Sequence, residues 1–342
     1  MCDSPLDFRD PIPPNQVYNA AQIPEQTTDP DRERGFTMMK RNVIRLFLGV
    51  ATAALLFTAP LQTSAQSAPS AMHKAKAPAS VRLYVFDCGT LHNADMGRFN
   101  LKNEDVTTSD MSMVCFLIAH PKGNLIWDTG AVPDDSWTPT GKTFTAHITL
   151  PDGQTREADV TKTLTGQLAE AGYSPADINF LSLSHYHYDH TANANEFAGA
   201  TWLVSQIERD VMLGGGKASG SIRPSTFSAL EKSKTIILKD KEYDVFGDAS
   251  VIIKSAPGHT QGHQVLYVKL AKTGGVVLSG DLYHYPAEMT LDRVPTFEFN
   301  QDQTRASRKD VAAFLKKTNS QLWMQHDSAG MSKIKKAPQF YE

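Results

Sequence analysis

A run of apolar residues leads directly into a cluster of metal-binding side chains in the segment LSLSHYHYDHTANANEF, residues 181–197. His185, His187, Asp189 and His190 form the pattern H-x-H-x-D-H. Because successive side chains of a strand point to opposite faces, the first two histidines share a face if strand geometry persists. Neutral imidazole is the commonest metal ligand in proteins, and a carboxylate adds neutralising charge. The segment therefore predicts a metal site at the end of a strand.

Three further segments place a candidate ligand at the end of an expected strand. His259 follows VIIKSA, Asp281 ends VVLSGD, and His326 follows LWMQ. Loops that leave a sheet are where a rigid scaffold brings ligands together. Each residue alone has an ordinary explanation, and Asp281 after Gly280 can be only a turn former. His263 can be a ligand, although a supporting role fits it better. The ordered set as a whole predicts a metal centre.

Apolar runs of strand length alternate with helical patterns in both halves of the chain, which predicts an α/β sandwich. Helices are expected at residues 160–173 and 303–318, and an exposed loop at residues 134–144. The net charge of −3 and the absence of a basic stripe argue against a nucleic-acid partner. Strands are expected at residues 81–87, 112–120, 123–129, 178–184, 201–205, 251–256, 263–270, 274–281 and 321–327.

The motifs SHYHYDH, APGHTQGH, SGDLYH and MQHD resemble those of the metallo-β-lactamase superfamily, and the resemblance covers most of residues 81–327. It implies an α/β fold, the four-layer αβ/βα sandwich, with two divalent metal ions at one edge of its two sheets. Zinc is the expected metal, although the same nitrogen and oxygen ligands can hold cobalt, manganese or iron. Asp128, in IWDTG, is expected to have a structural role near the site. The implied ligands are His185, His187 and His259 for one metal, Asp189, His190 and His326 for the other, and Asp281 as the bridge.

A complete ligand set with a bridging carboxylate resembles the dinuclear hydrolases of the superfamily. The segments YVFDCGTL and PGHTQGHQ are most similar to those of the N-acyl homoserine lactone lactonases, which implies quorum quenching by opening of the lactone ring. Hydrolysis of other esters, of thioesters or of organophosphate triesters remains an alternative. A non-catalytic metal-binding protein is a weaker one, because all seven ligand positions are filled. Candidate walls for an apolar trough holding the acyl chain of a small lactone or ester are Tyr186, Tyr188, Trp137, Phe297 and Phe299.

One position departs from the lactonase pattern. These lactonases commonly carry a tyrosine three positions after the bridging aspartate, and here DLYHY puts His284 there, between Tyr283 and Tyr285. Imidazole can donate a hydrogen bond in either protonation state, so we expect His284 to be catalytic and to take over that role. Asp189 and Asp281 complete the expected catalytic set. The alternative is a His284 that only supports Asp281.

The N-terminal part carries the pattern of an export signal. A basic start precedes the apolar run Leu46–Phe57, and small residues follow up to Ala65. The run is shorter than the roughly 20 residues that cross a bilayer. These features predict a non-native or disordered extension at residues 1–37, a signal peptide at 38–65, a linker at 66–80 and the hydrolase domain at 81–342. The processed protein is expected to be periplasmic or secreted, without stable membrane association; an uncleaved anchor is the alternative.

Cys88 and Cys115 are the two cysteines of the expected hydrolase domain. An oxidising compartment allows them to pair, and both lie in early strand-like runs. Sequence does not show whether their geometry fits a disulfide. We therefore expect two small buried hydrophobic residues, with a disulfide as the alternative.

Overall fold

The computed structural model describes residues 18–19, 75–93, 95–151, 153–214, 216, 218 and 221–342. The predicted signal peptide and most of the predicted linker lie outside the described residues. Of the predicted N-terminal extension, only β1 (Tyr18–Asn19) is described, and it pairs antiparallel with β14 (Ser320–Trp323). Within the described ranges, no helix has the length and apolar character required to cross a membrane.

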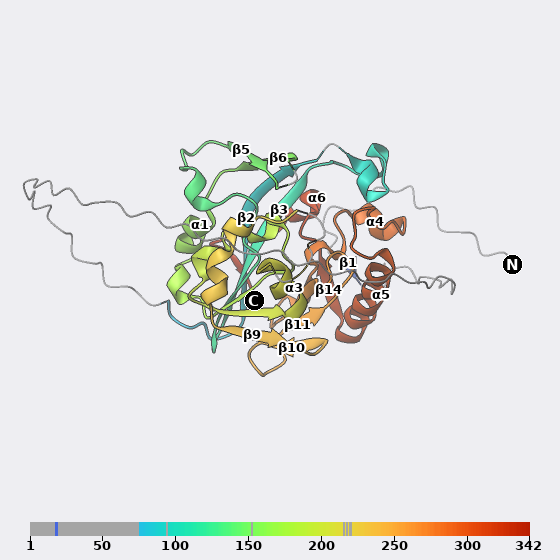
Figure 1. Cartoon of the computed structure of the whole chain (residues 1–342). Coiled ribbons are helices and arrows are strands. Elements are labelled where there is room, and N and C mark those ends of the chain that lie inside the picture. Colours follow the sequence, from blue (N-terminus) through green and yellow to red (C-terminus); the bar gives the residue numbers. More distant parts are fainter. Residues whose placement is uncertain are drawn as a thin grey trace, which may run out of the picture. The chain divides into compact units, whose positions relative to one another are not determined.

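Two β-sheets form the middle of the domain, and their strands come from both halves of the chain (Figure 1). The six-stranded sheet has the order β1-β14-β13-β12-β11-β10, and the nine-stranded sheet has the order β5-β6-β2-β3-β4-β7-β8-β9, with β15 paired to β2. The remaining strands are β2 (Arg82–His92), β3 (Met111–His120), β4 (Gly123–Trp127), β5 (Phe144–Thr149), β6 (Thr155–Val160), β7 (Phe180–Ser182), β8 (Thr201–Ser205), β9 (Thr235–Leu238), β10 (Glu242–Asp244), β11 (Val251–Ser255), β12 (Gln264–Leu270), β13 (Gly274–Leu278) and β15 (Phe340–Tyr341).

Alternating side chains place each sheet between two apolar layers. On β2, Leu83 and Val85 join the core between the sheets, whereas Tyr84 and Phe86 face the outer side of the nine-stranded sheet. This follows from the two-residue period of a strand. β3 is buried on both faces, which explains why it appears in the sequence as a continuous apolar run.

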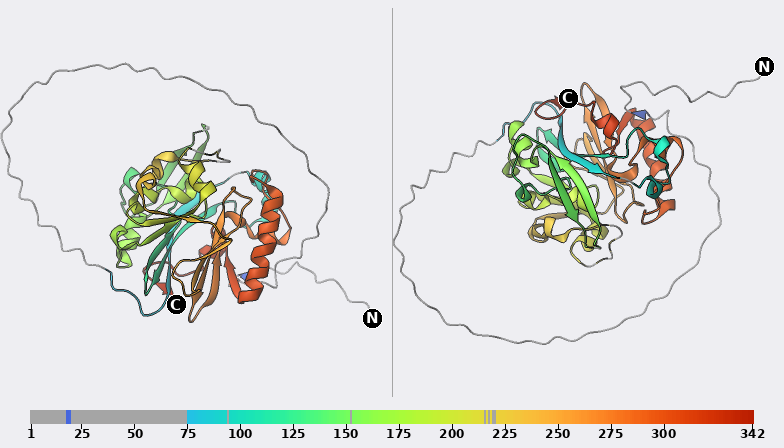
Figure 2. Two further views of the ribbon diagram at one scale, coloured as in Figure 1. Left: turned by 60° about the horizontal axis from the view of Figure 1, so that its bottom comes forward. Right: turned by 90° about the horizontal axis from the view of Figure 1, so that it is seen from above.

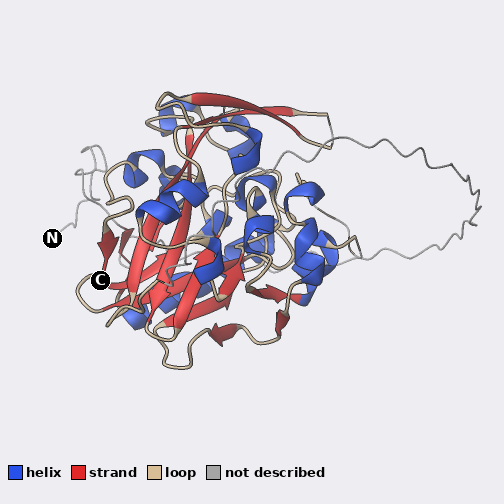
Figure 3. Cartoon of the chain, turned by 90° about the vertical axis from the view of Figure 1, so that its left-hand side faces the viewer, coloured by secondary structure: helices blue, strands red, loops and turns tan. Residues whose placement is uncertain are grey.

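Helices cover the outer faces of both sheets (Figure 2). α5 (Gln301–Thr318) packs on the six-stranded sheet through Val311, Phe314 and Leu315. α1 (Leu164–Glu170) and α3 (Gln206–Met212) contact β2 and β8 of the other sheet. The predicted four-layer αβ/βα sandwich is therefore confirmed, and helices and strands both contribute large parts of the domain (Figure 3). The shorter helices are α2 (Tyr188–Thr191), α4 (Pro286–Thr290) and α6 (Ser328–Met331).

The expectation of two unpaired cysteines is wrong, because Cys88 and Cys115 form a disulfide between β2 and β3. Their Cα atoms lie 6.1 Å apart, within the usual range for a disulfide. The register of β2 against β3 shifts between Asp87 and Thr90, so the first cysteine lies in a β-bulge. A bulge bends and twists its strand locally. The sequence does not reveal this local geometry.

Candidate metal centre

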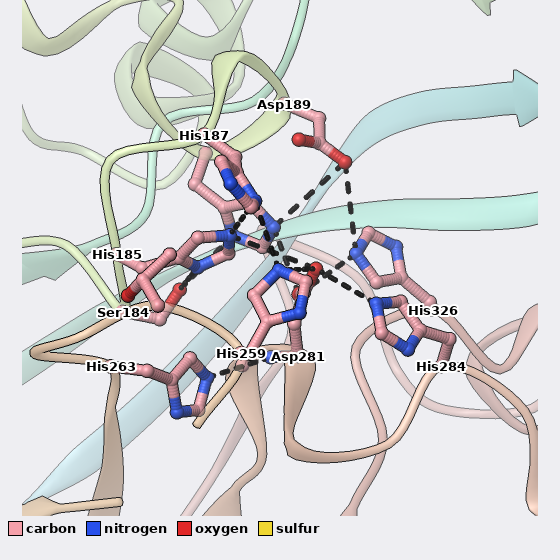
Figure 4. Close-up of polar contacts among 12 residues, drawn as sticks. Ser184, His185, His187, Asp189, His259, His263, Asp281, His284 and His326 are labelled. Carbon is pink, nitrogen blue, oxygen red and sulfur yellow. Dashed lines mark hydrogen bonds and ion pairs between the residues drawn. The ribbon is translucent and has the colours of Figure 1, made fainter. Parts of the chain in front are cut away.

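The structure brings all seven predicted ligands together in one cluster, and Figure 4 labels six of them. Each comes from a segment that follows a strand, as the sequence predicted, and each is buried. The HxHxDH motif lies after β7 and runs into the first residues of α2. The chain bends there, which lets the four side chains of the motif converge. The seven residues are His185, His187, Asp189 and His190 after β7, His259 after β11, Asp281 after β13, and His326 after β14.

Three imidazoles converge in the first group of this cluster. His187 Nδ1 lies 2.8 Å from His185 Nε2 and 2.9 Å from His259 Nε2. Asp281 Oδ2 lies 3.3 Å from His259 Nε2 and 3.7 Å from His185 Nε2. Ring nitrogens this close cannot all carry protons toward one another, whereas one cation can accept a lone pair from each. This donor set fits a divalent metal.

The second group lies on the other side of Asp281. Its Oδ1 is 3.0 Å from Nε2 of both His190 and His326, and Asp189 Oδ2 lies 3.9 and 3.8 Å from the same two nitrogens. Within the described part of the chain, His190 Nε2 is buried and makes no well-aligned hydrogen bond. A buried polar atom that makes no hydrogen bond is costly, and a metal ion would satisfy it. Asp281 thus presents one carboxylate oxygen to each group.

The outward nitrogens of three ligand rings are held by hydrogen bonds. His190 Nδ1 donates to Asp128 Oδ2 at 2.9 Å, and His259 Nδ1 lies 2.9 Å from Glu298 Oε1. His326 Nδ1 donates to the backbone carbonyl of residue 112 at 2.9 Å. Such contacts fix the tautomer and orientation of a ligand histidine, and they leave the inward Nε2 lone pair facing the cluster.

Asp128 links several segments of the site, as the sequence predicted for a structural residue. Besides contacting His190, its carboxylate accepts hydrogen bonds from the Ser184 backbone N–H at 2.6 Å and from Gln325 Nε2 at 2.8 Å. Its φ of 57° lies in the left-handed region, which aspartate tolerates better than most residues. Through these hydrogen bonds, the turn that carries Asp128 connects the segment after β7 with the segment after β14.

His263 supports the cluster and does not belong to it. Its Nδ1 donates to the Ala256 carbonyl at 2.9 Å, and its Nε2 accepts the Asp281 backbone N–H at 2.9 Å. Burial lowers the pKa of His263 to about 4, so the ring is neutral and both nitrogens are occupied. The supporting role favoured for His263 from sequence agrees with this geometry.

His284 lies against Asp281. Its Nε2 is 3.2 Å from Asp281 Oδ2, and its Nδ1 is 3.2 Å from Glu288 Oε1. Burial lowers the pKa of His284, but the charges of Glu288 and Asp281 outweigh burial and raise it to about 10. The neighbouring Tyr283 packs against the Arg308 guanidinium at 4.1 Å, away from the cluster. Between Tyr283 and His284, it is therefore His284 that faces the candidate centre.

The charge states of the cluster suit cation binding. Burial lowers the pKa of His185 well below its ordinary value and that of His259 to about 3, so both rings are neutral. Burial raises the pKa of Asp281, but the charges of His190 and His326 outweigh it and hold this carboxyl well below its usual range. Burial lowers the pKa of His190, and Asp281 and Asp128 reverse the shift and raise it. A bound metal would take the place of the proton that this raised pKa keeps on His190.

The predicted apolar trough is only partly present. Tyr188 and Phe297 line the cavity over the cluster. Tyr186 is buried in the core, Trp137 stacks on Phe144 5.4 Å away, and Phe299 is exposed. Burial and Asp189 raise the pKa of Tyr188, whereas nearby arginines at positions 156 and 98 oppose the shift.

Several supporting residues were missed from the sequence. Glu288 contacts His284 and accepts a hydrogen bond from Arg308 at 2.6 Å. Glu298 contacts Nδ1 of His259. These residues belong to no motif and lie in segments without a clear period. The only available signal was a charged side chain next to apolar residues, which is too common to be informative.

Comparisons with known proteins agree with this fold. Residues 111–320 match the Metallo-beta-lactamase superfamily. The N-acyl homoserine lactonase AttM of Azorhizobium caulinodans is 28% identical over 274 residues, covering 77% of this chain and 99% of that protein. The N-acyl homoserine lactonase AiiA of Bacillus thuringiensis subsp. kurstaki is 27% identical over 221 residues, covering 62% and 80%.

Solved structures share the fold. An N-acyl homoserine lactone hydrolase with N-hexanoyl-L-homoserine bound at its catalytic metal centre superposes with a TM-score of 0.61 at 21% identity, covering 76% of this chain and 99% of that one. The dizinc quorum-quenching lactonase AidC gives a TM-score of 0.56 at 20% identity, covering 79% and 96%. From its matched residues, its fold and its ligand cluster, the chain belongs to the metallo-β-lactamase superfamily.

Proposed function

We propose that this protein is a dinuclear metal-dependent hydrolase that opens the lactone ring of N-acyl homoserine lactones. The observation that carries the proposal is Asp281, whose two carboxylate oxygens face two separate groups of ligands. The substrate class is supported by the relatives named N-acyl homoserine lactonase, which this chain covers almost entirely, and by the solved hydrolase that holds a ring-opened product at its metal centre.

In this proposal the seven clustered residues are the metal ligands, and zinc is the metal. Nitrogen and carboxylate ligands around an open position are typical of catalytic zinc. Bound divalent ions would lower the pKa of a water molecule and polarise the lactone carbonyl. One ion is assigned to His185, His187 and His259, the other to Asp189, His190 and His326, with Asp281 shared.

The chain's own residues orient the substrate and handle protons. Asp189 lines the cavity over the cluster, and its carboxylate is assigned to accept a proton from the attacking water. His284 also lines this cavity, with Nδ1 fixed by Glu288. Its Nε2 is assigned to donate to the ring oxygen that leaves as an alkoxide. Placing a donor where negative charge develops lowers the barrier more than it strengthens ground-state binding.

We also propose that the protein works in the periplasm or outside the cell, after cleavage of the predicted signal peptide. The Cys88–Cys115 disulfide supports this location, because disulfides persist in oxidising compartments. A quorum-sensing lactone diffuses between cells, so an exported enzyme would meet its substrate there.

Metal content and ring opening test the proposal together. The zinc-loaded protein should contain close to two metal ions per chain and should open N-hexanoyl homoserine lactone with kcat/KM of roughly 10⁴–10⁸ M⁻¹s⁻¹. Asp281→Ala removes the shared carboxylate, so we expect loss of metal and at least a roughly 100-fold drop in kcat/KM. Asp302→Ala, an exposed position on α5, is the control and should change neither.

Full activity with one metal ion per chain would contradict the dinuclear mechanism. A phosphotriester or thioester turned over orders of magnitude faster than the lactone would instead assign the site to another hydrolase class.

A further inference from the structure

Two hollows that share part of their lining lie beside the candidate centre. An inner cavity of about 90 Å³ lies over the cluster, with Asp189, His259 and Asp281 in its wall. An outer hollow of about 580 Å³ adjoins it, and Arg98 and Arg156 line both. A lactone whose ring reaches the cluster would therefore extend its acyl group past these two arginines.

The outer hollow is unsuited to a plain hydrocarbon chain. Every described residue that lines it is polar or charged. An aliphatic chain placed there would displace water from polar groups without replacing their hydrogen bonds. The lining instead favours an acyl group with a polar end.

The acidic residues of this lining already have partners. Asp110 Oδ1 lies 3.0 Å from His92 Nδ1, and Glu157 Oε1 lies 3.2 Å from His147 Nδ1. Asp95 accepts a backbone N–H at 3.1 Å at the start of the 3₁₀ turn Met96–Phe99. None of these carboxylates forms an ion pair with either arginine in the described ranges.

The two arginines have no acidic partner among the described residues. The Arg98 guanidinium carbon lies 4.8 Å from the centre of the Phe297 ring, which is part of the inner cavity wall. Arg156 donates to two neutral oxygens, the Thr155 carbonyl at 3.3 Å and Gln154 Oε1 at 2.5 Å. Two uncompensated guanidinium groups at the junction of the hollows form a site for an anion, and guanidinium matches the planar geometry of a carboxylate.

We propose that Arg98 and Arg156 form a subsite for a carboxylate at the far end of the substrate's acyl group. The inference rests on the proposed lactonase function and narrows its substrate class to lactones with an acidic acyl chain. The ring would occupy the inner cavity, and the carboxylate would lie where the cavity meets the outer hollow.

A matched pair of lactones tests the subsite on the zinc-loaded full-length enzyme. N-hexanoyl and N-adipoyl homoserine lactone differ only in a terminal methyl group that becomes a carboxylate. We expect kcat/KM for the adipoyl compound to be higher by about 10-fold or more, mainly through a lower KM, because a charge-assisted hydrogen bond contributes on this scale. Added salt should reduce the preference, since the subsite is open to solvent.

Variants identify the groups responsible. The double variant Arg98→Gln/Arg156→Gln should bring the ratio of the two kcat/KM values close to one. Arg98→Lys/Arg156→Lys keeps the charge without the planar fork, so the ratio should fall between those of the wild type and the glutamine variant. Arg305→Gln removes one positive charge on α5, where Arg305 contacts Asp292, and should leave the ratio unchanged.

The outcomes separate the two proposals. If both lactones are opened but the wild type does not prefer the adipoyl compound, or the glutamine variant keeps the preference, the subsite is overturned and the lactonase function stands. If neither lactone is opened by enzyme with its full metal content, both proposals fail.

Discussion

The His284 ring is fixed at one nitrogen and faces the site with the other. Glu288 holds Nδ1 and in turn bonds Arg308 at 2.6 Å, so the ring orientation is set by a buried charged chain. The ring also lies parallel to His326, with centroids 5.7 Å apart. This arrangement suits a positioned donor, because little reorientation is needed when the substrate binds.

Replacing His284 distinguishes donation from support. We expect His284→Ala to keep both metals and to lower kcat/KM about 100-fold, the usual scale for a positioned proton donor. His284→Tyr should restore much of the rate, because a phenol can also donate. The metal content and the kcat/KM for the lactone are measured on the same samples of each variant. A loss of metal in proportion to the loss of rate would instead assign His284 to the support of Asp281.

Single residues show where prediction from sequence succeeds. The seven clustered residues were predictable because each follows a strand within a short recognisable motif. Glu288 and Glu298 were not, because their partners His284 and His259 are recognised only once the chain is folded. The dependence of such contacts on long-range packing is why local patterns do not reveal them.

At the scale of elements, Glu208 of α3 connects the loop that carries His259 with the HxHxDH segment. Its Oε1 accepts hydrogen bonds from the Thr260 hydroxyl and from the Gly262 backbone N–H at 2.9 Å, both in the loop that carries His259. It also accepts the backbone N–H of Tyr186 in the HxHxDH motif. A Cβ at Gly262 would lie only 2.7 Å from Glu208 Cγ, so only glycine permits this close approach.

Removing the hydrogen bonds of Glu208 should weaken metal binding. We expect Glu208→Ala to lower metal affinity by about 10-fold or more, as for other residues that orient ligands indirectly. Glu208→Gln keeps the Oε1 acceptor, so its loss should be smaller. Competition with a chromophoric chelator measures the affinity, and Asp210→Ala on the same helix is the control. Equal affinity in wild type and Glu208→Ala would show that the loops hold their geometry without the helix.

Glu208 also predicts a pH dependence of stability. Burial raises its pKa from 4.5 to about 7, so the folded protein binds a proton that the unfolded chain releases between these values. The free energy of unfolding should therefore fall as pH rises through this window, by at most about 3 kcal/mol, and stay level above it. Glu208→Gln should lack this component, which denaturant titrations at pH values below and above the window can detect. Parallel pH profiles for the two proteins would contradict the assignment.

The strand pair β5–β6 shows what element prediction missed. Residues 134–144 were expected to form a loop, and β5 begins at Phe144 with alternate side chains exposed. The pair forms an edge of the nine-stranded sheet, where few side chains enter the core, so its apolar pattern is weak. The missed strand β6 carries Arg156, which explains why the outer hollow was not predicted.

At the scale of the whole molecule, the disulfide lies directly under the turn that supports the site. A Cβ at Gly130 would lie 3.1 Å from Cys88 Cβ and 3.6 Å from Cys115 Sγ. Gly130 is two residues after Asp128, which contacts His190 and Ser184. The covalent link between β2 and β3 is thus packed against the segment that joins the central strands to the ligands.

Reduction of this disulfide should therefore lower the stability of the whole domain. The cysteines are 27 residues apart, and closing a loop of that length stabilises a protein by about 3–4 kcal/mol in the chain-entropy model. Denaturant titration with and without reductant should show a loss of this size in the wild type. Cys88→Ser/Cys115→Ser should be as unstable as the reduced protein and insensitive to reductant.

Protein recovered from the periplasm should begin after Ala65 and carry no free thiol. Free thiols in that protein, or a wild-type midpoint that reductant does not move, would contradict a disulfide acquired on export.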